Sequence, residues 1–415
     1  MTKASERSPW KQRWIVVLGG FLLAMVGGLS YSWGVFVEPM QTQFGWTKSD
    51  ATLPLSVFMV VFAIMMIPGG RMQEKIGLKK QIRLGAFLFL LAYVLSAFVH
   101  FTTNKWWLVF SYGVLGGISC GVTYSCIAPA IRRWFPDKPG LAVSLGVMGF
   151  GLASTFFAPF KARVALPYLG IAGTFLLIGG ITFVITWISS NLVRFPEDDW
   201  FTHLFGTMHL TGHTSSIMED VRPRQMLREK LFWFTWLSFL FVVFGSLMLI
   251  GILPSFGREA LNLTAAQAAI PLSFFALTNG LSRPIAGFLS DRIGSLQLML
   301  IVYTLQTAVY LVLPFYINTL PLLSAAGVIL GIGIGVTLAL FPVLTSEFFG
   351  VSHLGMNYGL LFSAYGFGAL AIPLGTWMHS LGKSYTPPLL LAGILSGAGT
   401  IILACILLFL RKRPH

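Results

Sequence analysis

The chain has 415 residues, of which 55% are hydrophobic and only 10% are charged. Soluble domains carry about 25% charged residues, so this composition excludes a soluble globular protein and indicates an integral membrane protein. The net charge of +14 suggests at first a nucleic-acid partner, but the distribution of the charges along the chain favours a different explanation.

Twelve stretches of the chain are apolar and long enough to cross a bilayer, which takes about 20 helical residues. They predict an all-α membrane protein with twelve transmembrane helices. The expected spans are residues 14–37, 52–69, 82–101, 106–131, 141–162, 166–189, 231–254, 266–290, 296–316, 320–345, 355–378 and 386–410. A long polar segment divides the chain into an N-terminal six-helix half (1–189), a cytoplasmic linker (190–230) and a C-terminal six-helix half (231–415).

The positive charges are distributed unevenly between the two sides of the predicted spans. If both termini are cytoplasmic, 21 of the 28 Lys and Arg fall in inner segments and six in outer loops. The six are Lys48, Lys105, Lys161, Arg163, Arg258 and Lys383. This is the positive-inside asymmetry, and it predicts that orientation in a cell membrane, with a bacterial inner membrane as the expected location. Membrane lipid is then an expected partner of the inner loops, and nucleic acid has no role.

The first span contains a run of small and aromatic residues past its middle, from Gly27 to Trp33. Small residues let helices pack closely, and tyrosine and tryptophan offer polar edges. We therefore interpret the run as a candidate lining of a transport pathway, with Tyr31 as its candidate site residue. An aromatic belt at the membrane interface explains Trp33 equally well and the deeper Tyr31 less well.

A short loop motif follows the second span. Gly70, Glu74, Gly77 and Lys79 are spaced as glycine, acid, glycine and base. Glycines let two helix ends approach, and a carboxylate attracts the N-terminus of a neighbouring helix. The spacing returns after the eighth span, 217 residues later (287 − 70), without the final basic residue. The matching residues are Gly287, Asp291 and Gly294.

Two further matches occur at almost the same offset. Residues 121–123 (GVT) recur as 335–337, and residues 149–151 (GFG) recur as 366–368. Repeats at a near-constant spacing indicate duplication into two pseudo-symmetric halves. Such halves rock around a site near the midplane, and we expect the glycine–acid loops to hold their cytoplasmic ends closed.

The sequence gives no sign of a metal or cofactor site. Three histidines stand in the linker at irregular spacing: His203, His209 and His213. A solvated linker with an interfacial helix explains them better than a metal-binding tract. Three cysteines fall within predicted spans: Cys120, Cys126 and Cys405. They are better explained as small buried hydrophobic residues than as disulfide partners or metal ligands.

The eighth span carries a fixed positive charge, Arg283, eight residues before Asp291, where the span ends. At about 1.5 Å per residue, Arg283 lies roughly 12 Å inside the nearer water boundary. An arginine at that depth costs about 3 kcal/mol on insertion scales, so it normally faces a bundle interior or a wet cavity. The sequence has no acid near the middle of any span, so we predict that Arg283 anchors an anionic substrate. Asn279, four residues earlier, shares its helix face.

The twelve spans in two repeated halves, together with the loop motif, resemble the major facilitator superfamily over the whole chain. Four stretches resemble its monocarboxylate transporter and oxalate/formate antiporter group: YSWGVFVEPM, RRWFPDKPGLA, FWFTWLSF and SRPIAGFLSDRIG. In that group the arginine before Pro-x-x-Gly in span eight binds substrate carboxylate, and the resemblance implies this role for Arg283. Tyr124 matches a pocket tyrosine of the antiporters.

The resemblance is incomplete at positions that set the charge of the site. The antiporters have a lysine in span eleven where this chain has Tyr365, and a single buried cation favours a monoanion over oxalate. Animal-type monocarboxylate transporters have an aspartate and a lysine, implicated in proton coupling, where this chain has Asn279 and Val35. If a proton is coupled here, the substrate itself or a group nearer the surface has to carry it.

These features predict a secondary active transporter of a lactate- or pyruvate-like monocarboxylate, linked to a proton and working as a monomer by alternating access. An oxalate/formate-type anion exchanger is the alternative. The candidate substrate-binding residues are Arg283, Asn279, Tyr124, Tyr365 and Tyr31. For Asn279 and Tyr124, a purely structural role in helix packing is nearly as good an explanation. An enzyme would need a catalytic set of acids, His or Cys within the spans, and a sensor would bind ligand without moving it.

Overall fold

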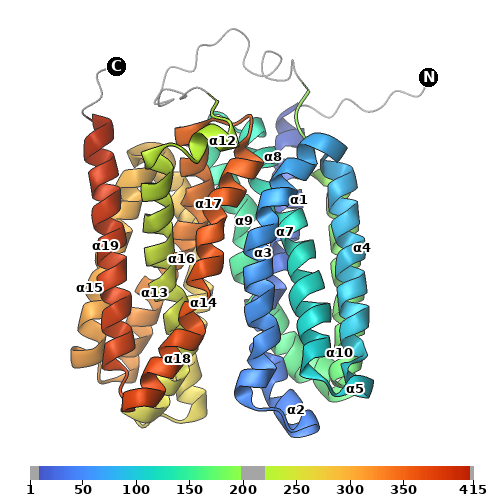
Figure 1. The fold of residues 1–415 in the computed structure, drawn as a ribbon, viewed down its shortest axis with the longest axis vertical. Helices are drawn as coiled ribbons and strands as arrows, with labels where there is room; N and C mark the ends of the chain where they lie inside the picture. The colour runs from blue at the N-terminus through green and yellow to red at the C-terminus, as the bar shows by residue number, and fades with distance from the viewer. Residues whose placement is uncertain (1–8, 198–219, 412–415) are drawn as a thin grey trace.

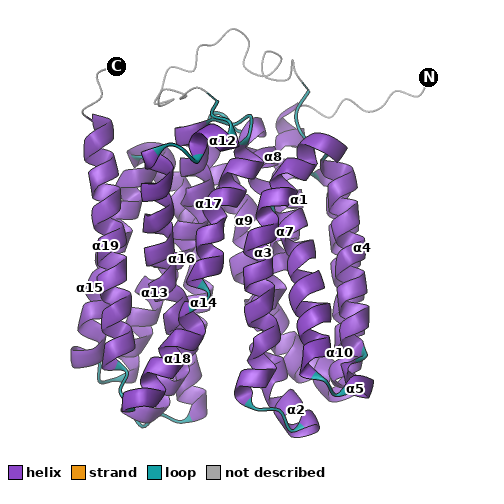
Figure 2. Cartoon of the chain, viewed as in Figure 1, coloured by secondary structure: helices purple, strands orange, loops and turns teal. Residues whose placement is uncertain are grey.

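The computed structural model describes residues 9–197 and 220–411, and every regular element within them is a helix (Figure 2). The first group comprises α1 (Pro9–Gly28), η1 (Leu29–Ser32), α2 (Gly34–Phe44), α3 (Lys48–Ile76), α4 (Leu78–Ala97), α5 (Val99–Thr102), α6 (Lys105–Leu108), η2 (Val109–Gly116), α7 (Gly117–Tyr124), α8 (Ile127–Trp134), α9 (Pro139–Phe160), η3 (Lys161–Ala165) and α10 (Leu166–Leu192). The second comprises α12 (Pro223–Met226), α13 (Lys230–Ala260), α14 (Ala265–Ile293), α15 (Ser295–Tyr316), α16 (Leu320–Phe349), α17 (Leu354–Gly368), α18 (Ala371–Gly382) and α19 (Thr386–Arg411).

Ten continuous helical segments in the described part of the chain are long and apolar enough to cross a membrane. One of them, Pro139–Leu192, is 54 residues long and covers the predicted fifth and sixth spans, 141–162 and 166–189. The predicted eighth span corresponds to α14, whose 29 residues include Arg283 and other polar side chains that dilute its apolar character. Counting the long segment as two and adding α14 gives twelve, which confirms the predicted all-α fold.

Corresponding helices of the two halves, α3 and α14, start with the same kind of N-terminal cap. Thr47 caps α3, and its hydroxyl accepts a hydrogen bond from the Asp50 N–H while the Asp50 carboxylate accepts from the Thr47 N–H. Thr264 and Gln267 form the same reciprocal pair at the start of α14. A capping box satisfies two backbone donors that a helix start otherwise leaves unpaired.

Corresponding helices also end alike, because α3 and α14 are both followed by a glycine in a backbone conformation that L side chains rarely adopt. Gly77 has φ +78° and Gly294 has φ +93°. Only glycine takes these values without strain, so each position allows a sharp turn directly into the next helix. The presence of glycine at the end of the loop motif, and at the end of its repeat, therefore has a local structural cause.

Figure 1 shows α1 to α10 on one side of the molecule and α13 to α19 on the other. Within these groups, α9 and α14 lie towards the middle of the molecule. The halves meet where α3 packs against α17 and where α9 packs against α14. At one end of the bundle the helices of the two halves lie together, and at the other the ribbons of α3 and α18 diverge (Figure 1). The division at 190–230 stays a prediction, because residues 198–219, which include the three linker histidines, lie outside the described residues.

The structure overturns two expectations about the N-terminal half. Trp33 is 1% exposed and donates its indole N–H to the Ala51 carbonyl at 2.8 Å, so the explanation of Trp33 as an interfacial belt residue is wrong. Lys161, counted above among the cations of the outer loops, is 2% exposed and lies inside the bundle at the junction of α9 and η3. The α9 helix continues directly into η3, and this continuity buries a residue that the predicted boundary places near water.

Candidate substrate-binding site

Arg283 lies on α14 and points into the bundle, with no exposed side-chain surface. Its Nη1 donates to the Val147 carbonyl of α9 at 2.7 Å, and its Nη2 donates to the Asn279 side-chain oxygen at 3.0 Å. Its Nε donates to the Asn279 carbonyl at 3.2 Å. In the described ranges no carboxylate lies within 4 Å of the guanidinium. Within the described residues, the acceptors that hold the positive charge are thus neutral oxygens.

Two glycines bring α9 and α14 close enough for this contact across the halves. A Cβ on Gly151 would lie 2.7 Å from the Gly280 Cα, and a Cβ on Gly280 would lie 2.5 Å from a Leu152 methyl group. Real Cβ atoms are not found so close to a backbone atom, so the approach requires glycine at position 151. This proximity is what allows a side chain of one half to reach the Val147 carbonyl of the other.

Tyr31 and Tyr365 form a second contact across the halves. Their hydroxyl oxygens are 2.8 Å apart, and the Tyr365 hydroxyl also lies 3.8 Å from the Met59 sulfur. Tyr31 belongs to η1, the short 3₁₀ segment that interrupts the first membrane span, and its ring packs edge-on against Phe150 at 5.0 Å. Tyr365 belongs to α17 and is 1% exposed.

Tyr124 occupies the end of α7 and is 5% exposed. Its ring packs edge-on against Phe62 and Phe150, with centroids 5.4 Å away in both cases. Phe150 stands three residues after Val147, whose carbonyl binds Arg283, and Phe62 also contacts the Tyr365 ring at 6.4 Å, so ring contacts connect Tyr31, Tyr124 and Tyr365 beside the guanidinium. The structure therefore gathers all five candidate residues of the sequence around one guanidinium, at the contact between the halves.

The sequence analysis missed two groups that belong to this cluster. Tyr358 on α17 is 3% exposed, and its hydroxyl has no hydrogen-bond partner among the described residues. It stands seven residues before Tyr365 in NYGLLFSAYGFG, a spacing of two helical turns that puts both side chains on one face and was available from the sequence. The second group is the Val147 carbonyl, a backbone atom that no sequence pattern identifies.

Asn279 offers a test of how the guanidinium is positioned. Replacing Asn279 by alanine removes one acceptor of Arg283 and leaves a buried N–H unpaired, which costs about 1–3 kcal/mol. We expect the KM for carboxylate uptake to rise roughly ten-fold while the protein still folds. The matched control is Thr278→Val, because the Thr278 hydroxyl donates to carbonyls of α14 and α16 and not to Arg283. An unchanged KM in Asn279→Ala would contradict this role.

The end at which the halves meet is formed by glycines of the loop motif and its repeat. A Cβ on Gly70 of α3 would lie 2.2 Å from the Gly355 carbonyl oxygen of α17, and a Cβ on Gly287 of α14 would lie 2.2 Å from the Gly140 carbonyl oxygen of α9. We call this the closing end and define it by Gly70, Gly140, Gly287 and Gly355. Both helix crossings bring backbone against backbone, which only residues without a side chain allow.

The acid of the repeated motif binds a helix N-terminus of the other half. The Asp291 carboxylate accepts hydrogen bonds from the backbone N–H groups of Gly140 at 2.7 Å and Leu141 at 2.9 Å. Both N–H groups belong to the first turn of α9, where they have no partner within the helix itself. The helix dipole also favours negative charge at this position. In the first motif, Glu74 instead lies 3.3 Å from the imidazole of His353, which precedes α17. Lys79 is exposed.

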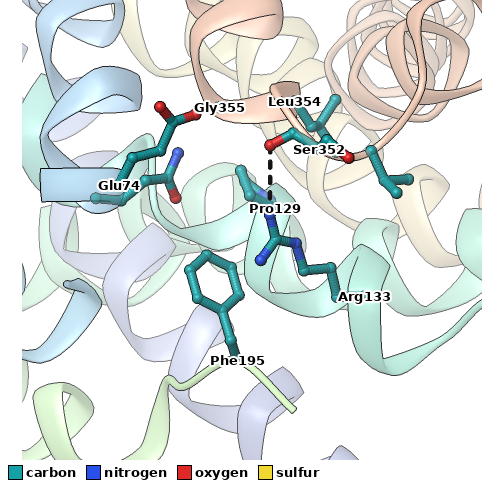
Figure 3. A pocket seen from close by; sticks show the side chains of 9 residues that line it. Glu74, Pro129, Arg133, Phe195, Ser352, Leu354 and Gly355 are labelled. Carbon is teal, nitrogen blue, oxygen red and sulfur yellow. Dashed lines mark hydrogen bonds between the residues drawn. The ribbon is translucent and has the colours of Figure 1, made fainter. Parts of the chain in front are cut away.

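A cavity of about 260 Å³ lies at the closing end between the halves (Figure 3). Arg133 of α8 extends beside the Phe195 ring, with its guanidinium carbon 4.1 Å from the ring centroid, and donates to the Ser352 carbonyl at 3.3 Å. Glu74 stands on the opposite wall (Figure 3). Both charged side chains come from the N-terminal half and contact the other half, Arg133 at Ser352 and Glu74 at His353, so the cavity marks a closing contact between the halves.

The end of the linker joins this closing contact. Asp220 accepts hydrogen bonds from the N–H groups of Val351 and Ser352 and from the Ser352 hydroxyl. Burial acts to raise the pKa of the Asp220 carboxyl, but these hydrogen bonds and the nearby His353 outweigh it and hold the pKa below its usual range. Asp220 therefore remains charged at neutral pH and anchors the segment before α12 to the chain between α16 and α17.

In its described residues, the structure has twelve membrane helices in two groups, which meet at glycine crossings around a buried arginine. A comparison with known families gives a matching result. A family model described as Major Facilitator Superfamily matches residues 16–316 and 235–415. The chain belongs to the major facilitator superfamily. It is consequently a multi-pass membrane protein of a transporter family, which is not an enzymatic one.

Relatives within the superfamily resemble the chain over most of its length. It is 28% identical to the oxalate:formate antiporter of Oxalobacter formigenes over 361 residues, which is 85% of this chain and 81% of that one. It is 25% identical to monocarboxylate transporter 13 of Bos taurus over 400 residues, covering 94% and 88% of the two chains. These identities support the predicted group within the superfamily and leave the transported compound open.

Solved superfamily structures share the fold at low sequence identity. A structure of FucP in the outward conformation is 15% identical, with a TM-score of 0.68 over 95% of this chain and 99% of that chain. The proton:xylose symporter XylE is 16% identical, with a TM-score of 0.71 over 96% of each chain. At this identity the likeness concerns the arrangement of the helices alone.

Proposed function

We propose that the chain is a secondary active transporter of small monocarboxylates of the lactate or pyruvate type, moved together with a proton by alternating access. The proposal rests above all on Arg283, a fully buried arginine with no carboxylate within 4 Å among the described residues. A buried charge held only by neutral acceptors is expensive, and an anion that binds there offsets that cost. A carboxylate fits the guanidinium because both are planar and form paired hydrogen bonds.

The surroundings of Arg283 favour a small anion with a polar group beside its carboxylate. Tyr31, Tyr124, Tyr358 and Tyr365 contribute hydroxyls, and Phe62 and Phe150 contribute apolar walls. A 2-hydroxy or 2-oxo acid matches this mixture of donors and apolar surface. In the proposed cycle the substrate carboxylate takes the place of the Val147 carbonyl on the guanidinium, and this exchange couples substrate binding to the contact between α9 and α14.

The positive-inside asymmetry supports an orientation with the closing end in the cytoplasm, because the inner segments carry most of the basic residues. With that orientation, the halves in this structure are in contact on the cytoplasmic side. We propose a monomer as the transporting unit, with residues 1–189 and 231–415 as the two rocking halves.

Transport is tested directly with purified protein in liposomes. We expect labelled lactate or pyruvate to accumulate when the outside is more acidic than the inside, and to accumulate much less at equal pH. An anion exchanger of the oxalate/formate kind is a second candidate, favoured by the 28% identity to the antiporter of Oxalobacter formigenes. Uptake into liposomes preloaded with a counter-anion, at full rate and without a pH gradient, would establish the exchanger and overturn the symporter.

The charge of the site predicts its preference among anions. Replacing Tyr365 by lysine adds a second cation to the Arg283 cluster, so the ratio of oxalate to lactate uptake is expected to rise about ten-fold. Tyr365→Phe is the control, because it removes the hydroxyl that binds Tyr31 without adding charge. If oxalate uptake gains nothing in Tyr365→Lys while lactate exchange persists, the charge of the site does not select the anion.

A further inference from the structure

Lys161 is another buried cation, and the carboxylate site does not use it. Its ammonium donates to the Ser32 hydroxyl oxygen at 2.8 Å and to the Leu29 carbonyl at 3.5 Å, and it lies 5.3 Å from the centroid of the Phe36 ring. The Ser32 hydroxyl donates its own hydrogen to the Leu29 carbonyl at 2.6 Å, so it acts as an acceptor for the lysine ammonium. The ammonium is thus surrounded by the Ser32 and Leu29 oxygens and by the Phe36 ring.

No acid balances this ammonium in the described part of the chain, where no carboxylate lies within 4 Å of it. Titratable residues on the elements packed around Lys161 are Tyr31 on η1, Glu38 on α2, Arg163 on η3 and Tyr168 on α10. Tyr31 is bonded to Tyr365, and the other three are exposed. A buried ionisable group in a membrane protein is costly to keep charged without a partner, and such groups commonly serve transport.

A second carboxylate-binding role for Lys161 is at odds with its position. It follows Val147, whose carbonyl holds Arg283, by fourteen residues (161 − 147), a distance on the order of 20 Å along α9. A lactate-sized anion cannot contact both cations at once. The space beside the ammonium is also occupied already, by the Ser32 and Leu29 oxygens and the Phe36 ring. A proton is the one ligand in the proposed transport that needs no additional space there.

The position of Lys161 connects its charge to the contact between the halves. Leu29 and Ser32 are the two ends of η1, and Tyr31, between them, bonds Tyr365 on the other half. A charged amine holds η1 by charge-assisted hydrogen bonds, and a neutral amine holds it more weakly. Lys161 also lies at the end of α9 away from the closing end, two residues from the exposed Arg163.

We propose that Lys161 is the proton-carrying residue of this transporter, and that η1 transmits its charge state to the Tyr31–Tyr365 contact. The inference rests on the proposed function, because it requires transport linked to a proton. Binding of the proton at the Lys161 amine and of the carboxylate at Arg283 would favour the same arrangement of the halves, so that the two move together.

The test compares two assays in liposomes: exchange of labelled lactate for unlabelled lactate at equal pH, and accumulation of lactate driven by an acidic outside. In Lys161→Gln we expect exchange within about three-fold of the wild type and a loss of at least about ten-fold in gradient-driven accumulation. The matched control is Arg163→Gln, which removes an exposed positive charge two residues away and should leave both assays unchanged. Gradient-driven accumulation at the wild-type level in Lys161→Gln would overturn the proposal.

A second variant decides the matter if Lys161→Gln does not exchange lactate. Lys161→Arg keeps a charge at every accessible pH, so it should exchange lactate and yet lose the response to the gradient. Lys161→Arg with a normal gradient response, or with no exchange, would overturn the proposal and leave Lys161 as a structural residue. Wild-type exchange without any gradient response would refute the proton linkage and this inference together while leaving the anion site intact. Wild type without exchange would refute carboxylate transport itself.

Discussion

Substitution of Arg283 by glutamine is expected to reduce lactate uptake and exchange by about 100-fold or more, because it removes the one buried cation that the described residues place in the tyrosine cluster. Glutamine keeps a hydrogen-bond donor near the place of the Arg283 Nε, which donates to the Asn279 carbonyl, so the variant should fold. Its effect on uptake then measures the charge and not the packing. Arg283→Lys should recover part of the activity, because lysine keeps the charge without the planar pair of donors.

Arg292→Gln is the matched control for Arg283→Gln. Arg292 lies nine residues further along α14, is exposed, and has its guanidinium carbon 4.1 Å from the centroid of the Phe288 ring. Removing its charge should change lactate exchange by less than about two-fold. Equal losses in Arg283→Gln and Arg292→Gln would mean that the activity follows total charge on the helix and not a binding site.

Substitution of Gly70 by alanine is expected to have the second largest effect, by opening the closing end. The new Cβ would lie between 2.2 and 2.5 Å from three backbone atoms of Gly355 and Met356, none of which is the flexible end of a side chain. The crossing of α3 and α17 must therefore widen, and the population should shift towards the state in which the halves are apart at this end. Lactate exchange should fall at least about ten-fold, because a state needed in each cycle is depleted.

Spin labels at two exposed positions, Lys79 on α4 and Arg292 on α14, report this opening as a distance across the closing end. The background needs Cys405 replaced by serine, because it is exposed, whereas Cys120 and Cys126 are buried. We expect Gly70→Ala to lengthen the measured distance. Gly180→Ala is the control, because a Cβ there meets nothing within 4 Å. An unchanged distance in Gly70→Ala would show that the glycine crossing does not hold the halves together.

Much of the fold follows from the sequence because membrane helices have a length and composition that few other structures share. The internal repeat fixed which helices correspond, and the matching turns at Gly77 and Gly294 have that origin. The depth of Arg283 followed from counting residues to Asp291. A buried charge is a strong signal in an apolar chain, because so few charges are present to be explained.

The remaining features depend on atoms or boundaries that no pattern reveals. Val147 contributes a backbone carbonyl, and its neighbourhood depends on how closely Gly151 and Gly280 approach. Lys161 was placed in an outer loop because the sequence there suggests the end of a span, whereas α9 continues into η3 and buries it. Tyr358 is different, because its spacing of seven residues from Tyr365 was a signal in the sequence that was not used.

A structure determined with bound lactate tests the central claim most directly. We predict that the lactate carboxylate lies with an oxygen about 2.7–3.2 Å from a guanidinium nitrogen of Arg283, and that Nη1 has left the Val147 carbonyl. A lactate carboxylate bound elsewhere, with the hydrogen bond from Arg283 to Val147 still in place, would contradict it.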